Sequence, residues 1–176
     1  MKKFILPLLL SGMLLIPVKG QKEEMSSPLL KHEIGMAAGW STGYGISYRY
    51  WPGRIGIQMT TTPYFEKNYS AASFGITGLM TLSEIQWMRV FLYLGNHYLY
   101  YRSMDYYGYD QFGNPVELSE PVNKSSGRYI LGIGPGFELM LGKKFGFNIM
   151  FGFRSDWSPD DYRISVTGET GIYYRF

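Results

Sequence analysis

Apolar and polar residues alternate along most of the chain after residue 30. Alternation with a period of two predicts β-strands that have two different faces, whereas no apolar stripe with helical spacing persists for more than about one turn. Eight strands are predicted, over residues 31–40, 43–51, 54–65, 71–82, 88–101, 128–141, 145–156 and 163–176. Each strand is about long enough to cross a bilayer at a tilt.

The connections between the predicted strands differ in length. Tight turns are predicted at Ser41-Thr42, at 51–54 and at 142–144, whereas the longest connection covers about residues 102–127 and contains several glycines and prolines. If the N-terminus starts on the periplasmic side, this long loop lies outside the cell and the turns at 51–54 and 142–144 face the periplasm. Short periplasmic turns with longer outer loops are typical of outer-membrane barrels.

The polar face of the predicted strands is unusually rich in glycine. A soluble, lipocalin-like barrel would have the same two-faced strands turned inside out, but glycine weakens an exposed strand. The lumen of an eight-stranded barrel is narrow, so glycine there makes room for a few large polar side chains. Glycine occupies this face at positions 35, 39, 45, 56, 75, 95, 132, 134, 136, 146, 152 and 171.

The apolar face has bulky residues at strand centres and aromatic residues toward strand ends, which is expected of a surface in contact with lipid. The aromatic residues near strand ends include Trp40, Tyr44, Tyr98, Tyr100, Phe145, Trp157 and Tyr174. Membrane-spanning helices are excluded, because charges, Pro135 and glycines interrupt the most apolar segment, 130–153. The sequence therefore predicts an all-β fold, an eight-stranded antiparallel up-and-down transmembrane β-barrel over residues 31–176.

Residues 1–20 have the pattern of a secretory signal peptide. Lys2 and Lys3 precede an apolar stretch over residues 4–18, and Gly20 offers a small residue for cleavage. Proline, serine and glycine interrupt that stretch, which makes it a poor permanent membrane helix, although an uncleaved N-terminal anchor is the alternative. Residues 21–30 then form a polar lead-in, and the mature protein is expected to leave the cytoplasm.

The composition excludes several classes of protein. The chain of 176 residues has a formal charge of +3, but without residues 1–20 it is neutral, with 14 basic and 14 acidic residues, so no nucleic-acid partner is expected. The absence of cysteine excludes a disulfide framework, a thiolate metal site and a lipid-modified N-terminal cysteine. Aromatic residues make up 18% of the chain, which excludes an intrinsically disordered protein.

The last predicted strand ends on an aromatic residue. Ile172, Tyr174 and Phe176 share one face, and this arrangement resembles the C-terminal signal that the barrel-assembly machinery reads in outer-membrane barrels of Gram-negative bacteria. The pattern from residue 31 to 176 resembles the small eight-stranded class that includes OmpX and the OmpA membrane domain. The resemblance implies an outer-membrane location and contact with membrane lipid and lipopolysaccharide.

Charged residues of both signs lie on the predicted lumenal face. They are Glu33, Arg49, Arg89, Glu138, Arg154, Glu169 and Arg175. Buried charges need partners, and this set can neutralise itself. Eight strands enclose a space that side chains about fill, and open channels need more strands. The set is therefore interpreted as a structural network, and a narrow pore is the first alternative.

The two histidines offer little support for catalysis. His32 is predicted on the lipid-facing side near the periplasmic end, and His97 on the lumenal side toward the outer end, where it could act as a general base. Small barrels that resemble the lipid A deacylase family have a serine two residues after such a histidine, but Leu99 stands there. We therefore expect no enzymatic activity, no cofactor and no metal site; a lipid-modifying enzyme is the second alternative.

The predicted outer loop contains tyrosines next to acids. Tyr106, Tyr107, Tyr109 and Asp110 are candidates for binding a sugar, a divalent ion or a protein, because tyrosine offers an amphipathic contact surface at low entropic cost. A long loop in a compact domain is more often functional than idle. The sequence thus favours a non-enzymatic protein with a structural or surface-interaction role, which includes the role of an accessory subunit bound to other envelope proteins.

Overall fold

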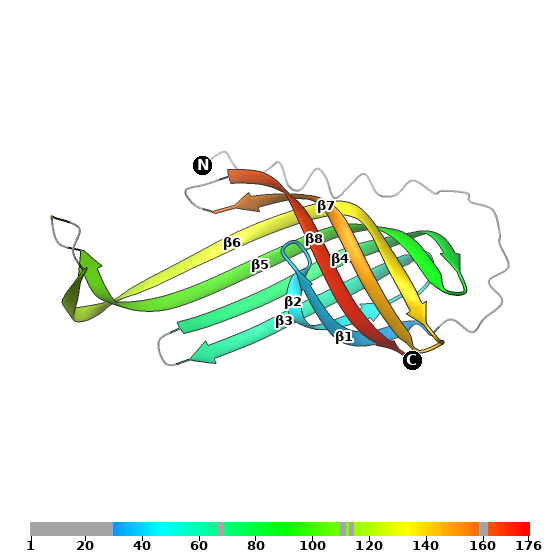
Figure 1. The fold of residues 1–176 in the computed structure, drawn as a ribbon, viewed down its shortest axis with the longest axis horizontal. Coiled ribbons are helices and arrows are strands. Elements are labelled where there is room, and N and C mark those ends of the chain that lie inside the picture. The colour runs from blue at the N-terminus through cyan, green and yellow to red at the C-terminus, as the bar shows by residue number, and fades with distance from the viewer. Residues whose placement is uncertain (1–29, 67–68, 110–111, 113–114, 159–161) are drawn as a thin grey trace.

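The computed structural model describes residues 30–66, 69–109, 112, 115–158 and 162–176. Eight antiparallel strands follow one another around a closed barrel (Figure 1). They are β1 (His32–Gly39), β2 (Gly43–Tyr50), β3 (Ile55–Glu66), β4 (Tyr69–Ile85), β5 (Met88–Tyr109), β6 (Pro115–Leu141), β7 (Phe145–Trp157) and β8 (Tyr162–Arg175). The predicted eight-stranded up-and-down barrel is confirmed. Residues 1–20 and 21–29, which hold the predicted signal peptide and most of the lead-in, lie outside the described residues.

The first and last strands close the barrel. In the register between β1 and β8, Glu33 lies opposite Arg175. Just beyond this pair, the backbone N–H of His32 donates to the carbonyl of Phe176 at 3.1 Å, and the N–H of Phe176 donates to the carbonyl of His32 at 2.8 Å. Closure removes the unpaired strand edges that an open sheet would present to other chains.

Side chains alternate between the outside and the lumen as the sequence pattern predicts. On β8, Val166 is 75% exposed and Ile164 64% exposed, whereas Glu169 and Tyr173 on the opposite face are buried. The same inversion holds on β7, where Phe151 and Phe153 are exposed. Apolar residues outside and charges inside are the reverse of the distribution in a water-soluble protein. Among the described residues there is no helix with the length and apolarity needed to cross a membrane.

β5 and β6 continue far beyond their predicted ends. The predicted loop over about residues 102–127 is wrong, because the two strands stay paired from Arg102 opposite Ser125 out to Tyr109 opposite Pro115. The glycines and prolines of this segment suggested a loop. Proline is tolerated at the first residue of a strand and at a bulge, and the β5–β6 register does shift between Asp105 and Tyr107.

The strands β3 to β6 rise above the rest of the barrel at one end. β2 pairs with β3 as far as Thr61, and β7 pairs with β6 from Tyr129 onward. Past these points β3 to β6 pair with one another in the described part of the chain, and Figure 1 shows the long β5–β6 ribbon projecting furthest. We call this extension the raised sheet; it comprises residues 62–66, 69–73, 99–109 and 115–128.

Candidate functional site in the barrel lumen

The two ends of the barrel differ. Tight turns lie at one end, at 51–54, 86–87 and 142–144, and we call it the turn end. The raised sheet lies at the opposite end, which we call the loop end. From the turn end to the loop end, the buried lumenal side chains of β5 include Arg89, Phe91, Tyr93 and His97. The lumen is accordingly filled by a charge network, then an apolar cluster, then a polar region.

The charge network lies near the turn end. Glu138 accepts hydrogen bonds from Nη1 of Arg49 at 3.2 Å and from Nη1 of Arg89 at 3.0 Å. Oε1 of Glu33 lies 3.3 Å from Nη1 of Arg89 and 3.1 Å from Nε of Arg175. All five side chains are buried. Removing one member of such a network would leave an uncompensated charge inside the barrel.

The membership of this network differs from the predicted set. Arg154 and Glu169 make no ion pair with it among the described residues, whereas Glu84 joins it, with Oε1 3.1 Å from Nη2 of Arg89. Three arginines then face three glutamates, so the network is neutral. The strand predicted here ends at Leu82, but β4 continues to Ile85 after a register shift between Thr81 and Ser83. The shift places Glu84 directly opposite Arg89.

Aromatic rings complete the surroundings of the arginines. The guanidinium of Arg49 lies 3.7 Å from the ring centre of Tyr173, and that of Arg89 lies 4.3 Å from the ring centre of Trp51. Cations over ring faces are attracted by the ring quadrupole. Trp51 belongs to a predicted turn, yet its side chain is 2% exposed. A Cβ at Gly56 would lie 2.5 Å from the Trp51 ring, so the glycine makes room for it.

A small apolar cluster occupies the middle of the lumen. Its members are Trp51, Leu79, Phe91, Tyr93 and Met150. The Trp51 and Phe91 rings meet edge-on, with centres 6.1 Å apart. The sequence pattern predicts a polar lumenal face and no apolar cluster, although alternation places Leu79 and Met150 on that face. Together with the network, the cluster leaves the lumen packed with side chains.

The tip of the β1–β2 hairpin folds into the lumen at the loop end. Ser41 and Thr42 are fully buried. The backbone N–H of Ser41 donates to Oε1 of Glu169 at 3.0 Å, and the Ser41 hydroxyl donates to the same oxygen. A Cβ at Gly95 would lie 2.5 Å from the Ser41 carbonyl oxygen, so the glycine-rich wall is what admits the tip. We call residues 40–43 the lumenal plug.

A serine–histidine pair lies beneath the lumenal plug. Oγ of Ser73 is 2.9 Å from Nε2 of His97, and Nδ1 of His97 is 2.6 Å from the carbonyl oxygen of Trp40. The carbonyl can only accept, so Nδ1 carries the proton and Nε2 accepts from Ser73. The sequence pattern indicates no nucleophile for His97, because the two residues are on different strands. Both side chains are buried, which separates the pair from lipid on the outer face.

The other predicted site residues lie elsewhere. Ile172, Tyr174 and Phe176 all lie on the outer face at the turn end, with 52%, 37% and 52% of their surfaces exposed. The candidate outer-loop residues fall at the far end of the raised sheet: Tyr106, Tyr107 and Tyr109 have their backbones in β5, and Asp110 lies outside the described residues. In the described part of the chain, no three histidine or acidic side chains lie close enough to hold a metal ion.

Known structures with a similar fold are small barrels from bacterial surfaces. The N-terminal β-barrel domain of Pseudomonas aeruginosa OprF aligns with a TM-score of 0.50 at 9% identity, over 82% of this chain and 95% of that one. Ail of Yersinia pestis gives 0.46 at 15% identity over 82% and 96%, and Neisserial surface protein A gives 0.46 at 15% over 82% and 94%. No protein-family model and no curated protein sequence matches the chain. The fold that the chain shares with these structures is a small eight-stranded antiparallel β-barrel.

Proposed function

We propose that the protein is a non-enzymatic, non-conducting barrel of the Gram-negative outer membrane whose raised sheet contacts other molecules at the cell surface. This proposal depends on one observation: the lumen is packed with side chains, while one sheet projects well beyond the barrel. The apolar outer wall supports the membrane location. In this orientation the turn end faces the periplasm and the loop end faces outward.

The packing of the lumen argues against the pore alternative. The charge network, the apolar cluster and the lumenal plug fill successive levels of the barrel, and eight strands leave no room for an aqueous channel around them. We expect planar bilayers that contain the purified protein to show no steady ion conductance. Large, stable current steps at neutral pH would contradict this part of the proposal.

The raised sheet is the surface that we assign to partners. β6 has no strand beside residues 115–128 other than β5, within the described part of the chain, and β3 has none beside 62–66 other than β4. Exposed edges can pair with another chain. Tyr64 is 49% exposed, and tyrosine is a frequent contact residue in binding surfaces. The partner class includes other envelope proteins, with this protein as an accessory subunit.

Deleting residues 104–126 tests the assignment to the raised sheet. The deletion leaves the pairing of β1 with β8 and of β6 with β7 intact, so we expect the variant to fold. The heat-dependent shift of its band in gels, which folded barrels show, checks this. Chemical cross-linking in intact cells, followed by purification in mild detergent, should then recover partners of the full chain and lose them for the variant. Recovery of the same partners would contradict the proposal.

The buried serine–histidine pair makes the enzyme alternative testable. Ser73→Ala removes the hydroxyl next to His97. The test compares the masses of lipid A from three strains, which carry the wild-type gene, this variant or no gene. We expect three identical spectra, because the pair is enclosed by the lumenal plug. A mass change that depends on Ser73 would establish lipid modification instead.

Two predictions from the sequence concern how the protein reaches and enters the membrane. The first is cleavage after Gly20, which N-terminal sequencing of the protein from outer membranes tests. The role of Ile172, Tyr174 and Phe176 in recognition by the barrel-assembly machinery is testable with Phe176→Ala, which should lower the amount of assembled barrel in cells. The exposure of these three side chains on the outer face supports that role.

A further inference from the structure

A small polar cavity lies at the loop end. It measures about 80 Å³ and is lined by Arg128, Arg154, Asp156, Ser158 and Arg163. Arg128 comes from β6, the next two from β7 and Arg163 from β8. By the alternation on these strands, the side chains fall on the lumenal side, at the mouth of the barrel. The cavity belongs neither to the charge network nor to the lumenal plug.

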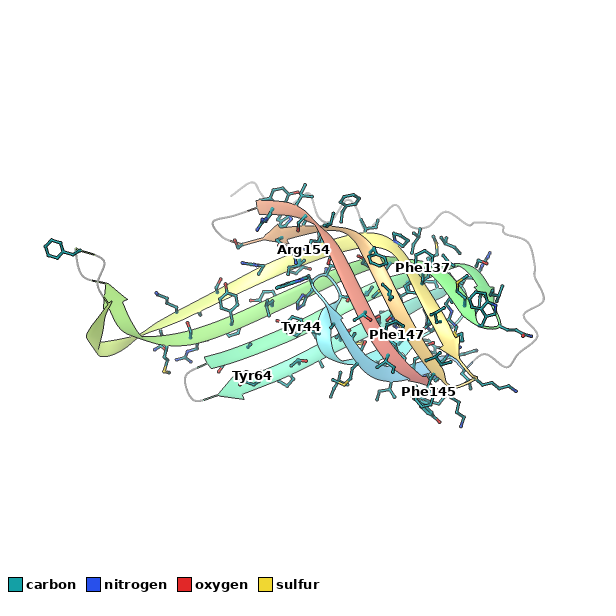
Figure 2. The ribbon with its side chains drawn as sticks, in the orientation of Figure 1. Tyr44, Tyr64, Phe137, Phe145, Phe147 and Arg154 are labelled. Carbon is teal, nitrogen blue, oxygen red and sulfur yellow. The ribbon has the colours of Figure 1, made fainter. Side chains whose placement is uncertain are left out.

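Arg154 is held in place from several sides. Its Nε donates to Oγ of Ser165 at 2.8 Å, its Nη2 lies 3.3 Å from Oδ2 of Asp156, and its guanidinium lies 4.7 Å from the ring centre of Trp40. Its Nη1 is buried and has no hydrogen-bond partner among the described residues. Figure 2 shows Arg154 beside the strands β7 and β8 near the loop end. A guanidinium that is already held in place and has an unpaired N–H donor is preorganised to bind a hydrogen-bond acceptor.

The cavity carries an excess of positive charge. Three arginines face one acid, so the described lining has a net charge of +2. Asp156 offsets Arg154 through their ion pair, whereas the side chains of Arg128 and Arg163 have no hydrogen bond or ion pair with any described residue. Clustered arginines that lack protein partners in a partly enclosed site favour binding of an anion, because guanidinium groups match the oxygens of phosphate and sulfate.

We propose that this cavity binds one tetrahedral oxyanion, a phosphate or sulfate group. Arg128 and Arg163 supply the charge, and Arg154 supplies the fixed donor. The group is either a free ion or the phosphate of a lipopolysaccharide headgroup. This site goes beyond the proposed function. Of the described lining residues, Arg128 alone belongs to the raised sheet, at its base, and the site holds whether or not that sheet has a protein partner.

Calorimetric titration of the full-length mature protein in phosphatidylcholine nanodiscs tests the site. Inorganic phosphate or sulfate is titrated into the protein while chloride keeps the ionic strength constant, because salt screens exposed charges. We expect saturable binding of both oxyanions. Arg163→Gln should lower the oxyanion affinity by on the order of tenfold, since a hydrogen bond to a charged group contributes about that much. The double variant with Arg128→Gln and Arg163→Gln should lower it further.

Arg54→Gln is the matched control. Arg54 is an exposed arginine at the turn end, so its replacement makes the same change in net charge at the opposite end of the barrel. We expect it to leave oxyanion affinity unchanged. Absence of saturable binding to the wild type, or equal affinity in wild type and the double variant with both confirmed as folded, would overturn the proposal. Equal losses in Arg54→Gln and Arg163→Gln would also overturn it, because they would show a non-specific charge effect.

A second titration distinguishes a free anion from a lipopolysaccharide phosphate as the occupant of the site. The titration is repeated in nanodiscs that contain lipopolysaccharide, either phosphorylated or enzymatically dephosphorylated. If the phosphorylated form alone suppresses phosphate binding, the headgroup occupies the site; if neither form suppresses it, the site takes a free anion. Both results support an oxyanion site. Suppression by the dephosphorylated form to the same extent would overturn it, because the competing group would then not be a phosphate.

Discussion

Nη1 of Arg89 lies 3.0 Å from Oε2 of Glu138 inside the barrel, and neither side chain is accessible to solvent. The two residues lie opposite each other in the register between β5 and β6. The contact thus joins neighbouring strands directly, while the second carboxylate oxygen of Glu138 reaches Arg49 on β2. One glutamate therefore ties three strands together through charge.

Glu138→Ala should destabilise the barrel strongly. It leaves Arg49 and Arg89 buried with one anionic partner fewer, and breaking a buried ion pair by removing one partner costs about 3–5 kcal/mol. The free energy of unfolding, measured by urea titration of the protein in lipid vesicles with tryptophan fluorescence, should fall by about that amount. The variant should remain non-conducting, because the apolar cluster still fills the lumen.

Glu84→Ala is the control for this prediction. Glu84 also pairs with Arg89, but its side chain is 22% exposed, so water compensates part of the loss and the cost should be closer to about 1 kcal/mol. Equal destabilisation by Glu84→Ala and Glu138→Ala would show that burial does not set the strength of the network.

Trp51→Ala should be among the most destabilising apolar truncations. The ring is buried against Phe91 and under the Arg89 guanidinium, and large-to-small changes at such sites cost about 3–5 kcal/mol. Trp87→Ala provides the comparison, because Trp87 is 58% exposed at another turn of the same end. The urea midpoint should therefore fall much further for Trp51→Ala; a similar fall for the two variants would argue against a lumenal Trp51.

Gly95→Ala should disturb the lumenal plug. The added methyl group would meet the Ser41 carbonyl oxygen at 2.5 Å, and overpacking of this kind costs roughly 1–3 kcal/mol. The temperature at which the folded band disappears in heat-modifiability gels should fall. Gly168→Ala should leave that temperature nearly unchanged, because nothing lies within 4 Å of a Cβ at Gly168. An unchanged transition in Gly95→Ala would mean that Ser41 does not occupy the lumen.

Phe151→Arg should separate a membrane barrel from a water-soluble one. Phe151 is 53% exposed at the middle of β7, and an arginine facing lipid at the bilayer midplane costs about 2–4 kcal/mol. Phe112→Arg, at an 80% exposed position between β5 and β6, should cost little. In lipid vesicles the unfolding free energy should fall for Phe151→Arg alone. If Phe151→Arg left it unchanged, lipid would not contact this face.

The sequence by itself determined the number of strands, their antiparallel order and the two faces of most strands. These follow from alternation, which depends on neighbouring residues alone: a run such as residues 145–153 has an outer and a lumenal set wherever the strand is placed. The glycines of the lumenal face were also readable, and their role in admitting large side chains follows from the small diameter of the barrel.

Tertiary structure decided how distant residues meet. The Ser73–His97 pair, the inward fold of Ser41 and the capture of Trp51 by Arg89 join segments that sequence patterns treat separately. Glu84 joined the charge network because a register shift changed which side of β4 it faces. The raised sheet was missed because glycine and proline indicate turns locally, whereas pairing between β5 and β6 stabilises extended backbone along the whole ribbon. Register and long-range pairing are cooperative properties of the closed barrel, and short segments do not encode them.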